Sequence, residues 1–396
     1  MTAGLAERYR IIDTDSHVSE PADLWTSRVP AKWGELVPHV VPDPRGPRAD
    51  GKVADIWVFG GELAMATGGP AMAGYNGFLP DHPATLADAH PAAFDSRARV
   101  RYLDDAGIWS QVIYPNVGGF GSGRFLQLRE PELMLDCVRA YNDFLSEWTS
   151  VAPERFIPIM ALPFWDVEAA VRELDRAWKL GHKGVLFGSQ PEGFEQPMLA
   201  DPHWDPIWAA AQERGLAINF HIISGAGFDL FGGYPGNGPH TNAAKQSAGF
   251  FLDNSSAIGD VIMGGICHRF PTLKFVSVES GIGWIPSYLE ALDWQWANMG
   301  AYTEHPERDL LPSEYFRRQV YGCFWFERES ARRVLDVYPD NWLFETDFPH
   351  PTSLSDGPVS TSGRPRDWVD KHLSGWPEHL LARVLHDNAA RVYGIE

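Results

Sequence analysis

The chain has 396 residues, 44% hydrophobic and 13% aromatic, which is enough to bury a large core. Its net charge of −19 argues against nucleic acid as a partner, because binding the phosphate backbone draws on clustered Lys and Arg. The sequence contains no apolar run of about 18 residues, the length that a helix needs to span a bilayer. Residues 1–9 lack the pattern of a secretory signal, and three scattered cysteines disfavour disulfides or a thiolate zinc site, so we expect a cytoplasmic globular protein.

Short apolar runs that resemble strands alternate with helical segments along the chain. Strands are predicted at residues 10–15, 110–114, 156–162, 184–187, 216–221, 273–279, 320–323 and 342–347. Helices are predicted at 132–150, 167–180, 205–214, 242–267, 285–299, 329–337 and 380–393. This alternation indicates parallel βαβ units, and runs that are apolar throughout suit strands covered on both faces.

Eight such units predict an α/β fold, a (β/α)8 TIM barrel that occupies residues 1–396 as one domain. A doubly wound open sheet is the competing architecture. It is disfavoured because no Gly-x-Gly-x-x-Gly follows the first predicted strand.

Residues 25–95 do not follow the alternation. They are rich in Pro and Gly, and residues 53–59 before Gly60 and Gly61 predict a small hairpin. An insertion after the first strand emerges at the carboxyl-terminal face of a barrel, so we expect this segment to cover the barrel mouth and supply part of the pocket wall. A surface excursion without a role at the mouth is the alternative.

Titratable side chains recur just past the carboxyl ends of the predicted strands, where the active sites of barrels form. They are Asp13, Asp15, His17, Glu20, His221, Glu279, Asp347 and His350. Each alone has an ordinary explanation as a turn residue or a hydrogen-bonded core residue. Together they would be costly to bury without a cation, and a mixture of imidazole and carboxylate suits Zn, Mn or Fe.

Four motifs occupy these strand ends and the C-terminal helix: Ile12-Asp-Thr-Asp-Ser-His17, Asn219-Phe-His221, Glu345-Thr-Asp-Phe-Pro-His350 and Leu385-His-Asp-Asn-Ala-Ala-Arg391. Together they resemble the amidohydrolase-related family, in the branch with aminocarboxymuconate semialdehyde decarboxylase and the γ-resorcylate-type decarboxylases. The resemblance covers nearly the whole chain outside the insertion. It implies a distorted barrel with one divalent ion, Zn or Mn, bound by His17, His221 and Asp347. Asp15 takes the place of the family's first His or Glu ligand.

One departure from the family pattern lies at the end of the sixth predicted strand. Family decarboxylases commonly have a histidine there that activates water or moves a proton, whereas this chain has Glu279. We predict that Glu279 lies beside the metal, outside its ligands, and carries a proton; Asp347 and His350 are the other catalytic candidates. A structural pairing of Glu279 with an arginine is the alternative. His268 precedes this strand, so we expect it to be structural.

Aromatic and cationic residues near the predicted mouth are the candidates for substrate binding. Aromatic rings stack on planar ligands, and cationic side chains bind carboxylates. The candidates are Trp25, Tyr114, Phe120, Arg124, Phe228, His240 and Trp284. The glycine-rich residues 118–123 lack the Lys-Ser/Thr of a phosphate loop, which favours a flexible rim over an anion cradle.

The favoured function is a metal-dependent, non-oxidative decarboxylation of an aromatic or enoic carboxylic acid. Hydrolysis of an amide, a lactone or a C–C bond by metal-activated water is the alternative. A binding protein that has lost turnover is a third hypothesis, which the full set of ligands disfavours. We expect a small-molecule substrate and a homodimer, with neither nucleic acid nor membrane as a partner.

Overall fold

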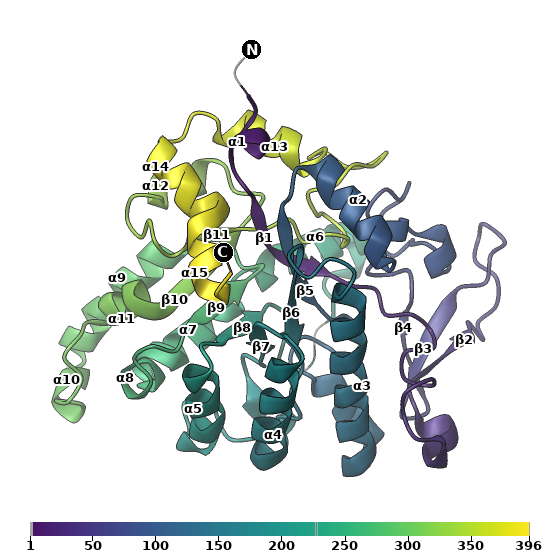
Figure 1. Ribbon diagram of the computed structural model, residues 1–396, viewed down its shortest axis with the longest axis horizontal. Helices are drawn as coiled ribbons and strands as arrows, with labels where there is room; N and C mark the ends of the chain where they lie inside the picture. Colours follow the sequence, from purple (N-terminus) through teal and green to yellow (C-terminus); the bar gives the residue numbers. More distant parts are fainter. Residues whose placement is uncertain (1–2, 226, 228, 396) are drawn as a thin grey trace.

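The computed structural model describes residues 3–225, 227 and 229–395, and its centre is a parallel β-barrel (Figure 1). Its eight strands are hydrogen-bonded in chain order. They are β1 (Ile12–His17), β5 (Ser110–Tyr114), β6 (Phe156–Met160), β7 (Gly184–Leu186), β8 (Ala217–His221), β9 (Phe275–Val278), β10 (Val320–Phe324) and β11 (Trp342–Phe344). The predicted (β/α)8 barrel is confirmed.

The barrel is closed by chain that follows β11. Ser16 forms a parallel bridge with Phe348, the Asp347 N–H donates to the Asp15 carbonyl at 2.9 Å, and the His17 N–H donates to the Phe348 carbonyl at 2.7 Å. The first strand begins and ends two residues later than the sequence predicts, so Ser16 and His17 belong to β1 itself. This closure brings the ends of β1 and β11 together.

Alternate residues of each strand face two different apolar clusters. Val112 and Tyr114 belong to the cluster inside the barrel, whereas Ile113 between them packs against the surrounding helices. Because side chains alternate along a strand and both faces are covered, the strands are apolar throughout.

The helices surround the barrel, and none in the described part of the chain is long and apolar enough to cross a membrane. They include α1 (Leu5–Arg8), α2 (Ser96–Ala106), α3 (Pro131–Thr149), α4 (Val167–Lys179), α5 (Asp205–Glu213), α9 (Ile285–Asn298), α10 (Ala301–Glu304), α11 (Pro312–Gln319), α12 (Glu329–Val334) and α13 (Pro365–Leu373).

The prediction of a single helix over residues 242–267 is wrong. The structure has three helices here, α6 (Pro239–Phe250), α7 (Asn254–Met263) and α8 (Ile266–Arg269). Between α7 and α8 the chain adopts a left-handed conformation at Gly265, with a φ of +76°, which ends a right-handed helix and favours glycine.

The C-terminal segment closes the amino-terminal end of the barrel. It runs through α14 (Glu378–Ala382), a π-helical turn (Arg383–Asp387) and α15 (Asn388–Tyr393). The Asn388 amide donates to the carbonyl of Trp342, the first residue of β11, and the Tyr393 hydroxyl donates to Asn219 Oδ1 at 2.8 Å inside the barrel. The opposite, carboxyl-terminal end is therefore the end left for a site.

The insertion contains a three-stranded antiparallel sheet of β2 (His39–Pro42), β3 (Asp55–Phe59) and β4 (Glu62–Ala66), beside the barrel in Figure 1. The predicted hairpin is β3 and β4. The N–H groups of Met72 and Ala73 donate to the Pro349 carbonyl at 2.8 and 3.0 Å, and the Ser19 N–H donates to Ala93 at 2.8 Å. Because these partners follow β11 and β1, residues 72–93 of the insertion lie against the carboxyl-terminal ends of these two strands.

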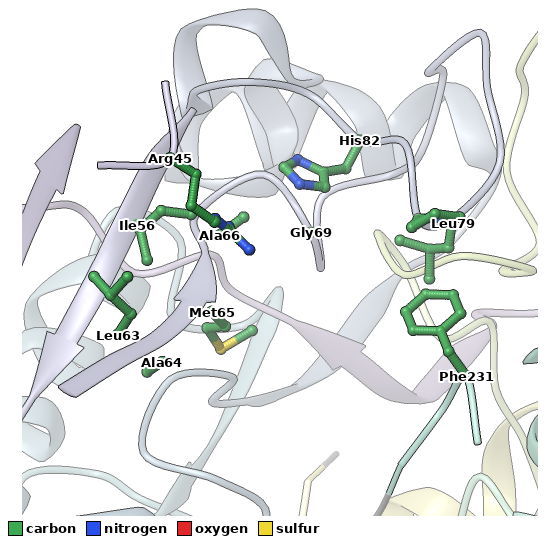
Figure 2. A pocket seen from close by; sticks show the side chains of 11 residues that line it. Arg45, Ile56, Leu63, Ala64, Met65, Ala66, Gly69, Leu79, His82 and Phe231 are labelled. Atoms are coloured by element: carbon green, nitrogen blue, oxygen red, sulfur yellow. The ribbon is translucent and has the colours of Figure 1, made fainter. Parts of the chain in front are cut away.

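A cavity of about 310 Å³ separates the insertion from the loop that follows β8 (Figure 2). Ile56 and Met65 of the insertion line one side of it, and Leu79 and Phe231 lie together on the other. The guanidinium of Arg45, also in its lining, is bound to Asp43 at 2.8 Å. The cavity is therefore mostly apolar, and its described lining includes none of the titratable residues at the strand ends.

Candidate metal centre

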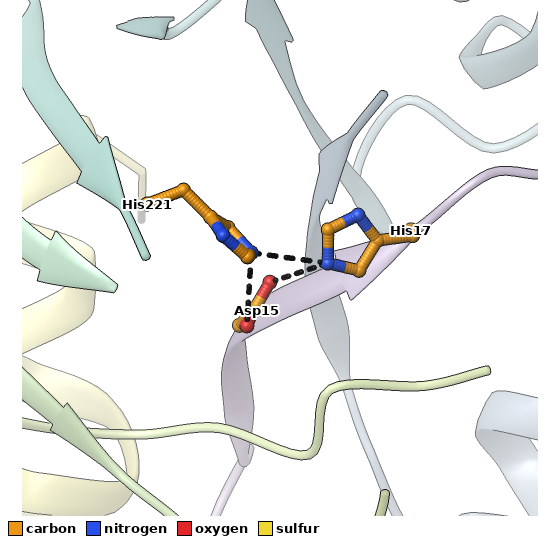
Figure 3. A group of neighbouring side chains, drawn as sticks. All are labelled: Asp15, His17 and His221. Atoms are coloured by element: carbon orange, nitrogen blue, oxygen red, sulfur yellow. Dashed lines mark hydrogen bonds and ion pairs between the residues drawn. The ribbon is translucent and has the colours of Figure 1, made fainter. Parts of the chain in front are cut away.

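Three side chains from opposite sides of the barrel meet at its carboxyl-terminal end (Figure 3). Asp15 and His17 project from β1, and His221 is the last residue of β8. The two imidazole Nε2 atoms are 3.2 Å apart. Asp15 places one oxygen 3.3 Å from His17 Nε2 and the other 3.6 Å from His221 Nε2. All three side chains are completely buried.

The two imidazoles direct lone pairs at a common point. His17 Nδ1 lies 3.0 Å from the Pro115 carbonyl, and His221 Nδ1 lies 2.9 Å from the Ile222 carbonyl. A carbonyl oxygen only accepts hydrogen bonds, so Nδ1 carries the proton in each ring and Nε2 of the neutral ring does not. This orientation, with Nδ1 held by the backbone and Nε2 free, is typical of metal-binding histidines.

Asp347, His350 and Glu279 complete the cluster. Asp347 Oδ1 lies 3.5 Å from His17 Nε2 and 2.8 Å from His350 Nδ1, and Glu279 Oε2 lies 3.4 Å from His221 Nε2. The His350 ring stacks on the His17 ring with centroids 3.8 Å apart. The six titratable residues therefore form one connected group.

The electrostatics of the group are those of buried, mutually repelling carboxylates. Burial raises the pKa of Asp15, but the positive charge that His221 and His17 carry when they are protonated outweighs burial and leaves this pKa below its ordinary value. Burial raises the pKa of Glu279 to about 8. Burial, followed by the charges of Glu279 and Asp15, raises the pKa of Asp347 well above its ordinary value. A divalent cation would relieve this excess of negative charge.

The residues fit a divalent metal ion. Both oxygens of Asp15 and Oδ2 of Asp347 are buried without a hydrogen-bond partner, and such orphaned groups are costly unless they bind a cation. Ligand atoms of Asp15, His17 and His221 lie within 4.8 Å of one another, as do those of two overlapping groups that include Asp347. Two imidazoles with carboxylates suit Zn or Mn.

A second layer of hydrogen bonds holds His350. Its Nε2 lies 2.6 Å from Asn116 Oδ1, and the Asn116 amide donates to the Val18 carbonyl at 2.9 Å. Glu20 accepts the backbone N–H groups of Asn116 and Val117 at 2.8 and 3.0 Å. Asn116 escaped the sequence analysis because its role depends on a loop conformation that has no sequence signature.

Phe120 and Tyr114 of the predicted substrate-binding set lie against the cluster. The Phe120 ring is 4.0 Å from the His221 ring and 5.1 Å from the His17 ring, measured between centroids. Tyr114 lies 5.6 Å from His221 and donates its hydroxyl to Asn219 inside the barrel. Phe120 therefore borders the candidate metal centre directly.

Arg124 interacts with the charge of Glu20, and Phe228 lies outside the described residues. Arg124 belongs to the 3-10 turn Gly123–Leu128, and it is half-buried. Burial lowers its pKa, opposed by the charge of Glu20. Among the described residues, no carboxylate lies within ion-pair distance of its guanidinium, and Glu20 Oε2 is itself without a hydrogen-bond partner.

Three other residues of the predicted substrate-binding set, Trp25, Trp284 and His240, form their hydrogen bonds with backbone carbonyls outside the cluster. Trp25 is completely buried, donates to the Cys137 carbonyl of α3 at 3.0 Å and packs in the core against Trp57 of the insertion. Trp284 donates to the Ser280 carbonyl at 2.8 Å. His240 is exposed, with Nδ1 2.8 Å from the Leu79 carbonyl.

His268 lies in α8 with Nδ1 3.0 Å from the Tyr315 hydroxyl, which is a structural contact.

The amidohydrolase family model matches residues 12–395, almost the entire chain. A γ-resorcylate decarboxylase from Polaromonas sp. (strain JS666) is 26% identical over 286 residues, which are 69% of this chain and 82% of that protein. A γ-resorcylate decarboxylase from Rhodococcus jostii (strain RHA1) is 24% identical over 265 residues, 63% of this chain and 76% of that protein.

Solved structures share the fold at low sequence identity. An amidohydrolase from Mycobacterium avium subsp. paratuberculosis K-10 has a TM-score of 0.74 and 23% identity, with 98% of this chain and 99% of that chain covered. The 5-carboxyvanillate decarboxylase LigW from Sphingomonas paucimobilis has a TM-score of 0.62 and 22% identity at the same coverage.

A dihydroxybenzoic acid decarboxylase from Polaromonas sp., solved with bound manganese and 2-nitroresorcinol, has a TM-score of 0.60 and 18% identity, with 98% of this chain and 97% of that chain covered. The barrel, the buried group of imidazoles and carboxylates at its carboxyl-terminal end, and the family match over nearly all of the sequence agree with one another. This chain belongs to the amidohydrolase family.

Proposed function

We propose that this protein is a divalent-metal-dependent decarboxylase of an aromatic or enoic carboxylic acid. The observation that carries the proposal is the buried cluster in which Asp15, His17 and His221 offer ligand atoms within 4.8 Å of one another, overlapped by two groups that include Asp347. In the described part of the chain, its aspartate oxygens have no hydrogen-bond partner. The similarity to γ-resorcylate decarboxylases supports the choice of reaction.

The four converging residues would hold the ion. Bound there, Zn²⁺ or Mn²⁺ supplies Lewis-acid polarisation of a substrate oxygen. Mn²⁺ is the first ion to test, since manganese is bound in the Polaromonas decarboxylase. His17 and His221 are pre-oriented for this role by the Pro115 and Ile222 carbonyls, so little reorganisation accompanies binding.

The remaining residues of the site would bind the acid and deliver a proton. Arg124 offers a guanidinium that forms no ion pair with a carboxylate of the described residues, and it is suited to a substrate carboxylate. Phe120 offers a ring face beside His221 for a planar substrate. As the bond between the ring or enoic carbon and the carboxylate breaks, its electron pair stays on carbon, CO2 leaves, and Glu279 donates a proton to that carbon.

Hydrolysis is the second candidate function, and Glu279 is the observation that favours it. Its carboxylate lies 3.4 Å from His221 Nε2, where it could accept a proton from an attacking water. The two reactions differ in their products, so a direct assay separates them.

The test combines metal binding with product analysis. The purified protein is stripped with a chelator, reloaded with Mn²⁺ or Zn²⁺, and assayed for CO2 release from hydroxybenzoates, β-keto acids and enol acids, and for hydrolysis of amides and lactones. We expect one equivalent of metal and metal-dependent CO2 release. Hydrolysis without CO2 release would favour the alternative.

The ligand assignment is tested with His221→Ala, which we expect to lose most of the metal and all detectable turnover. His268→Ala is the control, because His268 contacts only Tyr315 among the hydrogen-bond partners described for its ring. It should keep both metal and activity. A full equivalent of tightly bound metal in His221→Ala would show that the ligands are misassigned.

A further inference from the structure

We propose that Arg99 of α2 is a positioning residue, which fixes the ends of β1 and β11 so that their side chains can bind the metal. This inference rests on the metal centre of the proposed function. It concerns a side chain that touches neither the metal ligands' imidazoles nor their carboxylates, and it goes beyond the reaction itself.

The Arg99 guanidinium is bound to three parts of the chain at once. Nη2 donates to the His17 carbonyl at 2.6 Å, and Nε donates to the Ala92 carbonyl, at the end of the insertion, at 2.6 Å. Nη1 donates to Gln111 Oε1 of β5 at 3.1 Å. Only a planar fork with donors pointing in several directions can satisfy such separated acceptors.

The same guanidinium lies against the residue that follows Asp347. Arg99 Cζ is 4.6 Å from the centroid of the Phe348 ring, and the Phe348 carbonyl accepts the His17 N–H. One side chain thus contacts the backbone of His17 and the neighbour of Asp347, which belong to the two strand ends that close the barrel.

A chain of hydrogen bonds extends from Arg99 to β11. Gln111, which accepts from Arg99, donates from Nε2 to Asp13 Oδ2 at 2.7 Å. Asp13 accepts the Thr346 N–H at 2.8 Å and the Thr346 hydroxyl at 2.5 Å. Thr346 directly precedes Asp347, so the network reaches both ends of the ligand set.

Stability alone does not explain an arginine in the environment of Arg99. Its side chain is completely buried, and no carboxylate of the described residues lies within 4.0 Å of its guanidinium. A buried charge without an ion pair costs free energy that an apolar side chain would avoid. A role in holding several carbonyl groups in place would explain why a buried arginine is present despite this cost.

The expected consequence is a change in metal affinity. Residues that orient metal ligands typically change affinity by about 10–100-fold when they are substituted. Arg99→Lys keeps the positive charge and removes the fork, so we expect Mn²⁺ to bind about 10–100-fold more weakly. Gln111→Met breaks the link to Asp13 without altering a charge and should weaken binding about 10-fold.

The control is Arg155→Lys, at an arginine that is partly buried and pairs with Asp104 at 2.8 Å. Arg155 also donates to backbone carbonyls, those of Trp109 at 2.5 Å and Ile108 at 3.2 Å, but these precede β5 at the amino-terminal end of the barrel. This variant shows how an arginine-to-lysine substitution affects stability when the ends of β1 and β11, which carry the proposed metal ligands, are left unchanged. We expect wild-type Mn²⁺ affinity in this variant, whatever its melting temperature.

The experiment measures the dissociation constant for Mn²⁺ on the full chain, by competition with a fluorescent chelator and without substrate. The electron paramagnetic resonance spectrum of bound Mn²⁺ reports the symmetry of the site, and we expect it to change in Arg99→Lys but not in Arg155→Lys. Should Arg99→Lys fail to fold by circular dichroism, Gln111→Met decides.

Mn²⁺ affinity within twofold of wild type in the folded variants would overturn the role of Arg99. Failure of the wild-type protein to bind Mn²⁺ would overturn it together with the ligand assignment. Absence of CO2 release from every acid tested, with metal binding intact, would overturn only the proposed reaction.

Discussion

Glu279 and Asp347 occupy left-handed backbone conformations, with φ of +57° and +60°. For residues other than glycine this conformation costs on the order of 1–2 kcal/mol and is common at functional sites. The Glu279 N–H donates to Glu345 Oε2 at 3.2 Å, and the Asp347 N–H donates to the Asp15 carbonyl. These bonds hold the turns that aim both carboxylates at the histidines.

Glu279→Gln tests proton transfer at the residue scale. Glutamine keeps the shape of the side chain and removes the exchangeable carboxyl proton, and general acid–base groups contribute about 10²–10⁴-fold. We expect turnover to fall on that scale while the metal content stays at the wild-type level. In D2O the variant should also lose hydrogen exchange at the product carbon that takes up the proton.

The control is Glu314→Gln, because in the described part of the chain the Glu314 side chain accepts only the Leu311 N–H, at the start of α11. It should turn over normally. Near-normal turnover of Glu279→Gln would transfer the proton-carrying role to Asp347 or His350.

At the scale of elements, the Glu327 carboxylate binds two neighbouring backbone N–H groups of the loop after β9. Glu327 accepts the Ile282 N–H at 2.6 Å and the Gly283 N–H at 2.7 Å. Gly281 between Glu279 and these residues has a φ of +68°, and a Cβ atom there would lie 3.0 Å from Glu327 Oε2. The loop that presents Glu279 therefore depends on glycine at one position and a buried carboxylate at another.

Gly281→Ala should destabilise the fold by more than the backbone strain alone. The left-handed conformation costs an alanine about 1 kcal/mol. Crowding against Glu327 should raise the loss of unfolding free energy to about 2 kcal/mol or more. Urea denaturation of the wild type and the variant measures this loss of unfolding free energy.

Gly300→Ala is the matched control, since Gly300 has a similar φ of +75° and the nearest atom to its Cβ position is 3.9 Å away. Equal losses in the two variants would show that contact with Glu327 adds nothing.

At the scale of the whole molecule, buried titratable groups outside the site link stability to pH. His182 is completely buried, and its Nε2 lies 3.0 Å from the Asn142 carbonyl and 3.0 Å from the Ser146 hydroxyl of α3. Burial lowers its pKa to about 4, from an ordinary value of 6.5. The folded protein therefore keeps this imidazole neutral where the unfolded chain would protonate it.

Between pH 6.5 and pH 4 the unfolded chain binds more protons at this residue than the folded protein does. The contribution of His182 to stability is therefore complete above pH 6.5 and is lost as the pH falls toward 4, by about 3 kcal/mol in total. His182→Gln can still donate to the Asn142 carbonyl but does not titrate. Its unfolding free energy, measured by denaturation at several pH values, should fall less steeply in this window; identical slopes would contradict the assignment.

The sequence by itself determined the barrel and the strand ends that carry the proposed metal ligands and Glu279. Eight repeats of strand and helix leave few alternatives, because parallel strands need helical connections and a covered sheet needs apolar strands. The carboxyl ends of the strands converge in any such barrel. Chain order alone therefore predicts that one end of the barrel carries Asp15, His17, His221, Glu279 and Asp347.

Only the tertiary structure decided which neighbours support those residues. Arg99 and Asn116 act through carbonyl and amide groups of distant segments, and such contacts leave no periodicity or motif in the chain. The same holds for Trp25, which follows the first strand in sequence but packs into the core against the insertion and α3. Strand order follows from local patterns that repeat along the chain, whereas the partners of a side chain depend on how loops and helices pack in three dimensions.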